Sequence, residues 1–273
     1  MRNQERQQSS ATDVLGETLP LSAMHQLDEI TRSLCEAIAE NMMGIYLHGS
    51  LAMGCFNTES SDIDLLVVTQ TPLDSASQRA IVIALLAYSS QPHPIEISVV
   101  HYAQIASWRH PAPYDFHFSE IHRSVCAQLL SDPNATLPAG GNDPDLAAHF
   151  TVLAARGVCL HGAPINELPI DVPWDDYVAS LRSDFEWSQA PGNADATYAV
   201  LNGCRIWAAI ADRRVLSKAE GAQWALERIP TQFDVTIRLA AARYAAIDVG
   251  TMPELTKKEL GAFLTWIRKQ LGW

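Results

Sequence analysis

Two aspartates that lead directly into an uninterrupted apolar run constrain this chain more than any other segment. The apolar run at residues 65–68 is typical of a central strand that is buried in a sheet. Asp62 and Asp64 stand at its entrance with Ile63 between them, and alternate residues of an extended chain point to the same side. Both carboxylates are therefore expected on one side of the strand, where they repel each other unless a divalent cation neutralises them.

A small-residue turn precedes this strand. Residues 44–48 are expected to form a strand that ends at Gly49-Ser50, and a short helical turn follows towards Gly54. Glycines allow the backbone to approach a ligand closely, and free N–H groups with a serine hydroxyl can bind phosphate oxygens. A turn of this kind is common in proteins, so alone it says little about function.

A third carboxylate belongs to the next expected strand. Ile95, Ile97 and Val99 would form one face of that strand, which leaves Glu96 on the opposite face. If residues 95–100 pair beside residues 64–69, Glu96 can join the two aspartates around the same metal ions.

Each of these features also has a plain structural explanation. Glu96 alone could be a solvated carboxylate on an edge strand, and Asp62 alone could be a turn former. The ordered combination of a Gly-Ser turn, an Asp-x-Asp strand and a later strand carboxylate instead favours a site that binds metal ions and phosphate.

The rest of the chain suggests two domains. We expect an α/β front domain and then an almost entirely helical part, with the boundary near residue 165, where glycine and proline residues accumulate. The first helix is expected at residues 21–41 with Gly44 as its stop, and residues 105–118 are expected to be a long aromatic-rich loop. The other expected helices lie at residues 75–88, 120–130, 145–156, 173–188, 195–212, 218–228, 231–246 and 253–271.

The charge distribution excludes some partners. Residues 1–166 carry a net charge of −10 and contain no lysine, whereas the remainder carries −2. An acidic surface of this kind argues against binding to nucleic acid, which requires clustered Lys and Arg. It suits a cationic small molecule or bound metal ions.

The cysteines and the hydropathy of the chain indicate its cellular compartment. Five scattered cysteines without a C-x-x-C pair are typical of reduced thiols in the cytosol. Residues 1–20 are polar, lack the apolar region of a signal peptide and are expected to be a mobile tail, and no stretch is apolar enough to span a membrane. We expect a cytoplasmic protein that has no membrane partner.

Gly49-Ser50, Ser61-Asp62-Ile63-Asp64 and Glu96 together resemble the DNA-polymerase-beta-like nucleotidyltransferase superfamily. Within it, most of the chain resembles the aminoglycoside (3″)(9) adenylyltransferases, which act on streptomycin and spectinomycin. The likeness also includes Trp108-Arg109 in the front domain and, in the helical part, Arg205-Ile206-Trp207, Ser217-Lys218 and Trp224-Ala225-Leu226. It implies an α+β nucleotidyltransferase domain with a mixed sheet flanked by helices at residues 21–165. An all-α bundle would follow at residues 166–273.

The resemblance implies roles for individual residues in binding ATP. Asp62 and Asp64 would bind two Mg²⁺ ions, and Glu96 would be the base that accepts a proton from the antibiotic hydroxyl. The residues that would contact the nucleotide are Gly49, Ser50, Ser61, Asp62, Asp64, Lys218, Tyr244 and Arg205. Lysine is otherwise most often a solvated surface residue, and a mid-helix arginine often has a structural role.

The resemblance also implies an antibiotic site. Asp195 matches a family carboxylate that contacts the drug, although it is also expected to cap the following helix. Trp187 matches a family tryptophan that serves streptomycin, while residues 188–193 contain no acid where the family has one. Ile121 stands where another family tryptophan is expected, and Phe116 and Phe118 close by could replace it. Whether streptomycin, spectinomycin or both are accepted therefore stays open.

The function implied is transfer of AMP from ATP to a hydroxyl of an aminoglycoside or aminocyclitol, by a monomer, with release of pyrophosphate and resistance to the drug. A related alternative keeps this chemistry but modifies a protein or an RNA end, as toxin-like nucleotidyltransferases do. A second alternative is a nucleotide-binding module without catalysis, for which a base such as Glu96 would have no use.

Overall fold

The computed structural model describes residues 20–132, 140–190, 195–245 and 255–273. The chain divides into two compact units, Met1–Val172 and Pro173–Trp273. The expected tail at residues 1–20 lies outside the described residues except for Pro20.

The first unit is built on a mixed five-stranded sheet in the order β5-β3-β2-β1-β7. Strands β2 and β3 run parallel, whereas the other neighbouring pairs are antiparallel. This arrangement confirms the mixed sheet. The strands are β1 (Met42–His48), β2 (Ile63–Thr69), β3 (Ile95–His101), β5 (Phe116–Phe118) and β7 (Val158–Gly162), and a second small sheet pairs β4 (Ala112–Tyr114) with β6 (Gly141–Asp143).

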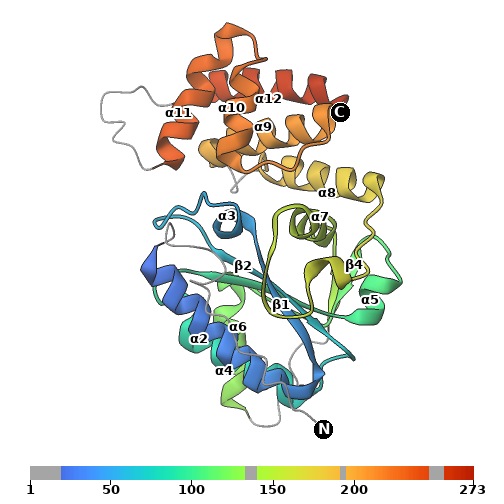
Figure 1. Cartoon of the computed structure of the whole chain (residues 1–273). Helices are drawn as coiled ribbons and strands as arrows, with labels where there is room; N and C mark the ends of the chain where they lie inside the picture. The colour runs from blue at the N-terminus through green and yellow to red at the C-terminus, as the bar shows by residue number, and fades with distance from the viewer. Residues whose placement is uncertain (1–19, 133–139, 191–194, 246–254) are drawn as a thin grey trace. The chain divides into compact units, whose positions relative to one another are not determined.

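Helices cover both faces of the main sheet, and α2, α4 and α6 lie together on one face (Figure 1). The opposite face is covered by α7. The helices are α2 (Leu21–Ile38), α3 (Gly49–Ala52), α4 (Ser75–Tyr88), α5 (Tyr102–Ala106), α6 (Arg123–Ser131) and α7 (Leu146–Arg156), and the 3₁₀ turns are η1 (Ala39–Asn41), η2 (Glu120–His122) and η3 (Ile165–Glu167).

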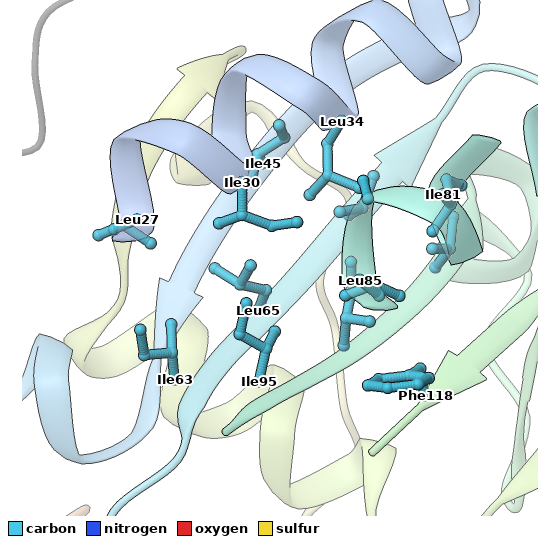
Figure 2. Close-up of a cluster of buried hydrophobic side chains, with 14 of the residues drawn as sticks. Leu27, Ile30, Leu34, Ile45, Ile63, Leu65, Ile81, Leu85, Ile95 and Phe118 are labelled. Carbon is cyan, nitrogen blue, oxygen red and sulfur yellow. The ribbon is translucent and has the colours of Figure 1, made fainter. Parts of the chain in front are cut away.

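Alternation along the strands divides the buried side chains into two cores. On the α2 and α4 side, Leu27, Ile45, Leu65 and Ile95 are at most 1% exposed and pack together (Figure 2). On the α7 side, a second cluster includes Tyr46, Leu66, Val68, Val100 and Phe150. Because neighbouring strand residues point to opposite faces, Asp64 and Glu96 belong to the α7 side of the sheet.

Several predictions for this unit were wrong in detail. The first helix ends at Ile38, and Gly44 lies inside β1, where a Cβ would come 2.2 Å from the Tyr46 hydroxyl oxygen. The expected loop at residues 105–118 instead contains the end of α5 and the strands β4 and β5. Strands β6 and β7 were not predicted, because their short segments show neither long apolar runs nor regular alternation.

The second unit is helical, as expected, and α9 packs against the other four α-helices of the unit. Three tryptophan rings of this unit pack edge-on, with Trp207 4.7 Å from Trp224 and 4.9 Å from Trp266. The elements are α8 (Trp174–Trp187), α9 (Ala196–Asp212), α10 (Lys218–Leu226), η4 (Thr231–Phe233), α11 (Asp234–Tyr244) and α12 (Lys257–Leu271).

The ends of these helices follow ordinary capping rules. The Ser217 hydroxyl accepts from the Glu220 backbone N–H at 3.2 Å and the Glu220 carboxylate accepts from the Ser217 N–H, which together form a capping box. The last helix begins at Lys257 behind a second capping box at Thr256, later than residue 253; Pro253 and Glu254 lie outside the described residues.

None of the helices in the described ranges combines the length and the hydropathy that a bilayer crossing requires. The cysteines at positions 35, 55, 126, 159 and 204 are all free thiols.

Candidate active site

The centre of the site is a row of three side chains across the sheet. Asp64 of β2 is the register partner of Glu96 on the parallel strand β3 and of His48 on the antiparallel strand β1. Residues in register on neighbouring strands lie side by side on the same face. Ladder hydrogen bonds therefore fix Asp64 and Glu96 next to each other, as the sequence predicted for paired strands.

The turn after β1 approaches Asp64 very closely. Gly49 has a φ of +65° and begins α3, and a Cβ on it would lie 1.8 Å from Asp64 Oδ2. Only glycine tolerates both this backbone conformation and this contact. Ser50 follows in α3 and is half-buried, and its carbonyl accepts a hydrogen bond from the Cys55 N–H at 3.0 Å. The turn thus places Gly49 against Asp64, and Ser50 follows it directly.

A compact loop delivers Ser61 and Asp62 to the start of β2. The Ser61 hydroxyl, in a residue only 6% exposed, accepts from the Asn57 N–H at 3.0 Å, and the Ser61 N–H donates to the Asn57 carbonyl at 2.8 Å. Asp62 is exposed and directly precedes β2. The Ile63 N–H donates to the carbonyl of Pro94 at 2.8 Å, which ties the entrances of β2 and β3 together.

The donor set can be tested for its fit to magnesium. Asp62, Asp64 and Glu96 offer carboxylate oxygens, the ligands that Mg²⁺ prefers. Within the described residues, no three His, Cys, Asp or Glu side chains form a group that could hold a metal ion by themselves. Magnesium usually binds through one or two carboxylates plus water and substrate phosphates, so the two aspartates at the entrance of β2 fit it where a substrate supplies phosphate oxygens.

Histidines line the same face of the sheet, which the sequence analysis did not anticipate. The His48 ring lies 4.9 Å from that of His149 on α7. The Ser98 hydroxyl and His117 Nδ1 are hydrogen-bonded at 3.0 Å, two residues beyond Glu96 along β3. Burial lowers the pKa of both His48 and His117, so their rings are held neutral. His117 stands between Phe116 and Phe118 in the sequence. This alternation was the signal that its side chain points away from the core on the α2 and α4 side.

The structure does not support an antibiotic-binding role for Phe116 and Phe118. Their side chains are 5% and 0% exposed and belong to the core on the α2 and α4 side. Figure 2 shows Phe118 beside Leu85 of α4. Because residues i and i+2 of a strand point to one face, both phenylalanines face away from Asp64 and Glu96. The prediction relied on proximity in sequence and ignored this alternation.

In the second unit, Lys218 and Tyr244 lie close together. The Lys218 ammonium is 4.5 Å from the ring centroid of Tyr198 and 5.4 Å from that of Tyr244. A cation over aromatic faces is stabilised by the ring quadrupoles. The lysine is also the first residue of α10, so its charge adds to the positive end of that helix.

Arg205 belongs to a hydrogen-bonded network with Asp184 and Asn202. Its Nη2 lies 3.3 Å from Asp184 Oδ2, and its Nε donates to Asn202 Oδ1 at 2.7 Å. Tyr198 donates its hydroxyl to Asp184 Oδ1 at 2.8 Å. Sequence reasoning identified Arg205 but neither Asp184 nor Tyr198, since no local motif marks residues brought together from two helices.

The structure confirms the capping role of Asp195. Its carboxylate accepts from the backbone N–H groups of Thr197 and Tyr198 at 2.8 and 3.3 Å, while the residue as a whole is exposed. Trp187 is 55% exposed and packs edge-on against the ring of Tyr198 at 6.1 Å. Both side chains are therefore accessible, which a ligand-binding role requires.

Comparisons with known proteins identify related chains. Residues 167–270 match the family model described as the C-terminal domain of aminoglycoside adenylyltransferase. The aminoglycoside (3'') (9) adenylyltransferases of Klebsiella pneumoniae and Escherichia coli are each 30% identical to the chain over 227 residues, which cover 80% of this chain and 84% of theirs. The spectinomycin 9-adenylyltransferase of Campylobacter jejuni is 22% identical over 245 residues.

A solved structure shares the fold. The spectinomycin adenyltransferase of Enterococcus faecalis, crystallised with ATP and spectinomycin, superposes with a TM-score of 0.73 at 20% identity, covering 91% of this chain and 99% of that one. This match confirms the expected fold class. With 30% identity over four fifths of its length to curated relatives, the chain belongs to the aminoglycoside (3'') (9) adenylyltransferase family.

Proposed function

We propose that this protein transfers AMP from ATP to a hydroxyl of an aminocyclitol or aminoglycoside antibiotic, spectinomycin or streptomycin, and thereby inactivates the drug. The observation that carries the proposal is the register pairing of Asp64 with Glu96 beside the turn at Gly49. Two carboxylates fixed side by side next to a phosphate-binding turn suit phosphoryl-group chemistry. The family relatives are named for the same activity.

In this proposal Glu96 is the general base. It accepts the proton of the drug hydroxyl as that oxygen attacks the α-phosphorus of ATP, and pyrophosphate leaves on the opposite side. The oxygen–phosphorus bond to the drug forms as the bond to pyrophosphate breaks. Because β3 is hydrogen-bonded on both sides by β2 and β5, the base is held on a rigid element.

The remaining residues bind the nucleotide and its metal ions. Asp62 and Asp64 would hold two Mg²⁺ ions, and the chemistry that these ions would supply is Lewis-acid stabilisation of the charge on the phosphates. Gly49, Ser50 and Ser61 contact the phosphates. Lys218, Arg205 and Tyr244 are also proposed as nucleotide contacts, and the two cations suit phosphate oxygens in a chain that has no lysine before residue 167.

The drug contacts that we propose are Glu96, Asp195 and Trp187. An exposed carboxylate suits a cationic drug, and Asp195 combines exposure with a position fixed by two backbone hydrogen bonds. We also propose that the enzyme acts as a monomer in the cytoplasm, where ATP is available.

The test is a product assay. The protein is incubated with Mg-ATP and either spectinomycin or streptomycin, and the drugs are weighed by mass spectrometry. A gain of one AMP on at least one drug, with release of pyrophosphate, is expected. No gain on either drug would refute the proposed acceptors, and label on a protein or RNA acceptor would assign a different one.

A further inference from the structure

One carboxylate, that of Asp184 on α8, is linked to both of the cations that we propose as phosphate ligands. It contacts Arg205 directly and Lys218 through the ring of Tyr198. Its Oδ1 accepts from the Tyr198 hydroxyl at 2.8 Å. Its Oδ2 accepts from Asn202 Nδ2 at 3.0 Å and from Arg205 Nη2 at 3.3 Å. The side chain is 21% exposed, so these three bonds form in a partly desolvated place where they are stronger than on an open surface.

The first connection runs to Arg205. The guanidinium is held at Nη2 by Asp184 and at Nε by Asn202, whose side chain is fully buried. Two bonds along one edge of a planar group fix its orientation as well as its position. The arginine, which carries many rotamers when unbound, is thus ordered before any ligand arrives.

The second connection runs to Lys218 through Tyr198. The hydroxyl of Tyr198 is bonded to Asp184, and its ring lies 4.5 Å from the lysine ammonium. The backbone N–H of the same tyrosine is bonded to the cap residue Asp195. Tyr198, whose ring supports the ammonium, is therefore held both at its hydroxyl and at its backbone.

We infer that Asp184 is a positioning residue for the nucleotide, acting on the phosphates through Arg205 and, by way of Tyr198, through Lys218. The inference rests on the proposed ATP-binding role of these two cations. Groups that are ordered before binding lose less conformational entropy when the ligand arrives, so preorganisation raises affinity. A carboxylate also repels phosphate, but the two cations exceed the one carboxylate, so the group stays net positive.

The substitution Asp184→Asn separates the positioning of the two cations from the repulsion between the carboxylate and the phosphates. The amide retains one acceptor oxygen but turns an NH₂ group towards hydrogen-bond donors, which breaks the network. If positioning dominates, the dissociation constant for Mg-ATP rises about tenfold, the loss of about one charge-assisted hydrogen bond. Adenosine has no phosphates, so its dissociation constant is expected to change less than about twofold. A general loss of structure would affect both ligands alike.

Equilibrium dialysis of the full chain with Mg-ATP and with adenosine measures both constants. Tyr198→Phe removes only the hydroxyl and should weaken Mg-ATP binding by about threefold. Asp175→Asn removes an exposed carboxylate from the first turn of the same helix and should leave both constants unchanged. Circular dichroism checks that each variant is folded.

Two results would overturn the inference. One is Asp184→Asn binding Mg-ATP as tightly as the wild type or more tightly, and the other is an equal loss for Mg-ATP and adenosine. If Asp184→Asn does not fold, unchanged Mg-ATP binding by Tyr198→Phe overturns it instead. The product assay is separate: a wild type that binds Mg-ATP but modifies no drug refutes the proposed acceptors and leaves Asp184 to be judged by binding.

Discussion

The contact between Gly49 and Asp64 predicts that one added methyl group disables the enzyme without unfolding it. In Gly49→Ala the new Cβ would lie 1.8 Å from Asp64 Oδ2 and 2.6 Å from its Cγ. Asp64 is the second residue of β2, so its side chain can rotate away from the new methyl group. This rotation relieves the clash but displaces the proposed metal ligand.

The magnitudes follow from the geometry. An ordinary contact begins at 3.4 Å, so the carboxylate must retreat by about 1.6 Å, and a misplacement of about 1 Å at a catalytic centre can cost ~100-fold in rate. The left-handed backbone at φ +65° costs an L-residue about 1–2 kcal/mol. For a unit of this size that corresponds to a fall in Tm of about 2–8 °C.

Gly54→Ala is the matched control. Gly54 lies in the same turn with a φ of +68°, and a Cβ on it would have nothing within 4 Å. It therefore carries the same backbone penalty without touching Asp64. Initial rates of AMP transfer and thermal melts of both variants are the assay.

We expect similar Tm values for the two variants and a rate at least ~30-fold lower for Gly49→Ala than for Gly54→Ala. Equal rates would refute the reasoning, because strain alone would then explain the loss. A Gly49→Ala enzyme that retains more than about a tenth of the wild-type rate would refute it too.

Three further outcomes are expected. Glu96→Gln keeps the size of the side chain but removes the base, so kcat should fall by about 10²–10⁴ while Mg-ATP still binds, and an unchanged kcat would exclude Glu96 as the base. Asp195→Ala and Asp74→Ala each remove an N-cap and should each cost about 1 kcal/mol in denaturant melts, but only Asp195→Ala should raise the KM for the drug; equal KM effects would contradict the drug contact. Burial lowers the pKa of His117 and His93 below 6.5, so the stability they contribute is complete above pH 6.5 and is lost as pH falls towards their folded pKa values. Thermal melts of wild type and His117→Gln at about pH 7.5 and about pH 5 check this, and an equal acid-induced loss in both proteins would exclude His117 as a source.

The elements with strong periodic patterns were predictable from the sequence. The apolar run of β2 and the alternation of β3 placed Asp64 and Glu96 on one face, and their exact register confirms that expectation. The capping signal at Asp195 marked the start of α9 correctly. In these places a local pattern and the tertiary structure agree.

The failures have a common cause in long-range contacts. Gly44 reads locally as a helix stop, but the ring of Tyr46 occupies the space that a side chain there would need. Tyr198 and Asp184 are hydrogen-bonded although they lie on different helices, so no spacing in the sequence reveals the bond. Phe116 and Phe118 were assigned by their proximity in sequence, whereas the pairing of β5 with β3 turns both rings into the core on the α2 and α4 side.

The position of β1 in the sheet has a consequence for how the protein is made. One edge of β1 pairs with β2, which follows closely, but the other pairs with β7 at Val158–Gly162, and the Tyr46 hydroxyl bonds to the carbonyl of Ala163. While the chain is being synthesised, that edge has no native partner until β7 has left the ribosome. During this interval it is an unpaired apolar strand, the kind of surface on which nascent chains associate wrongly. Slow translation between β1 and β7 would lengthen the interval during which this edge of β1 is unpaired.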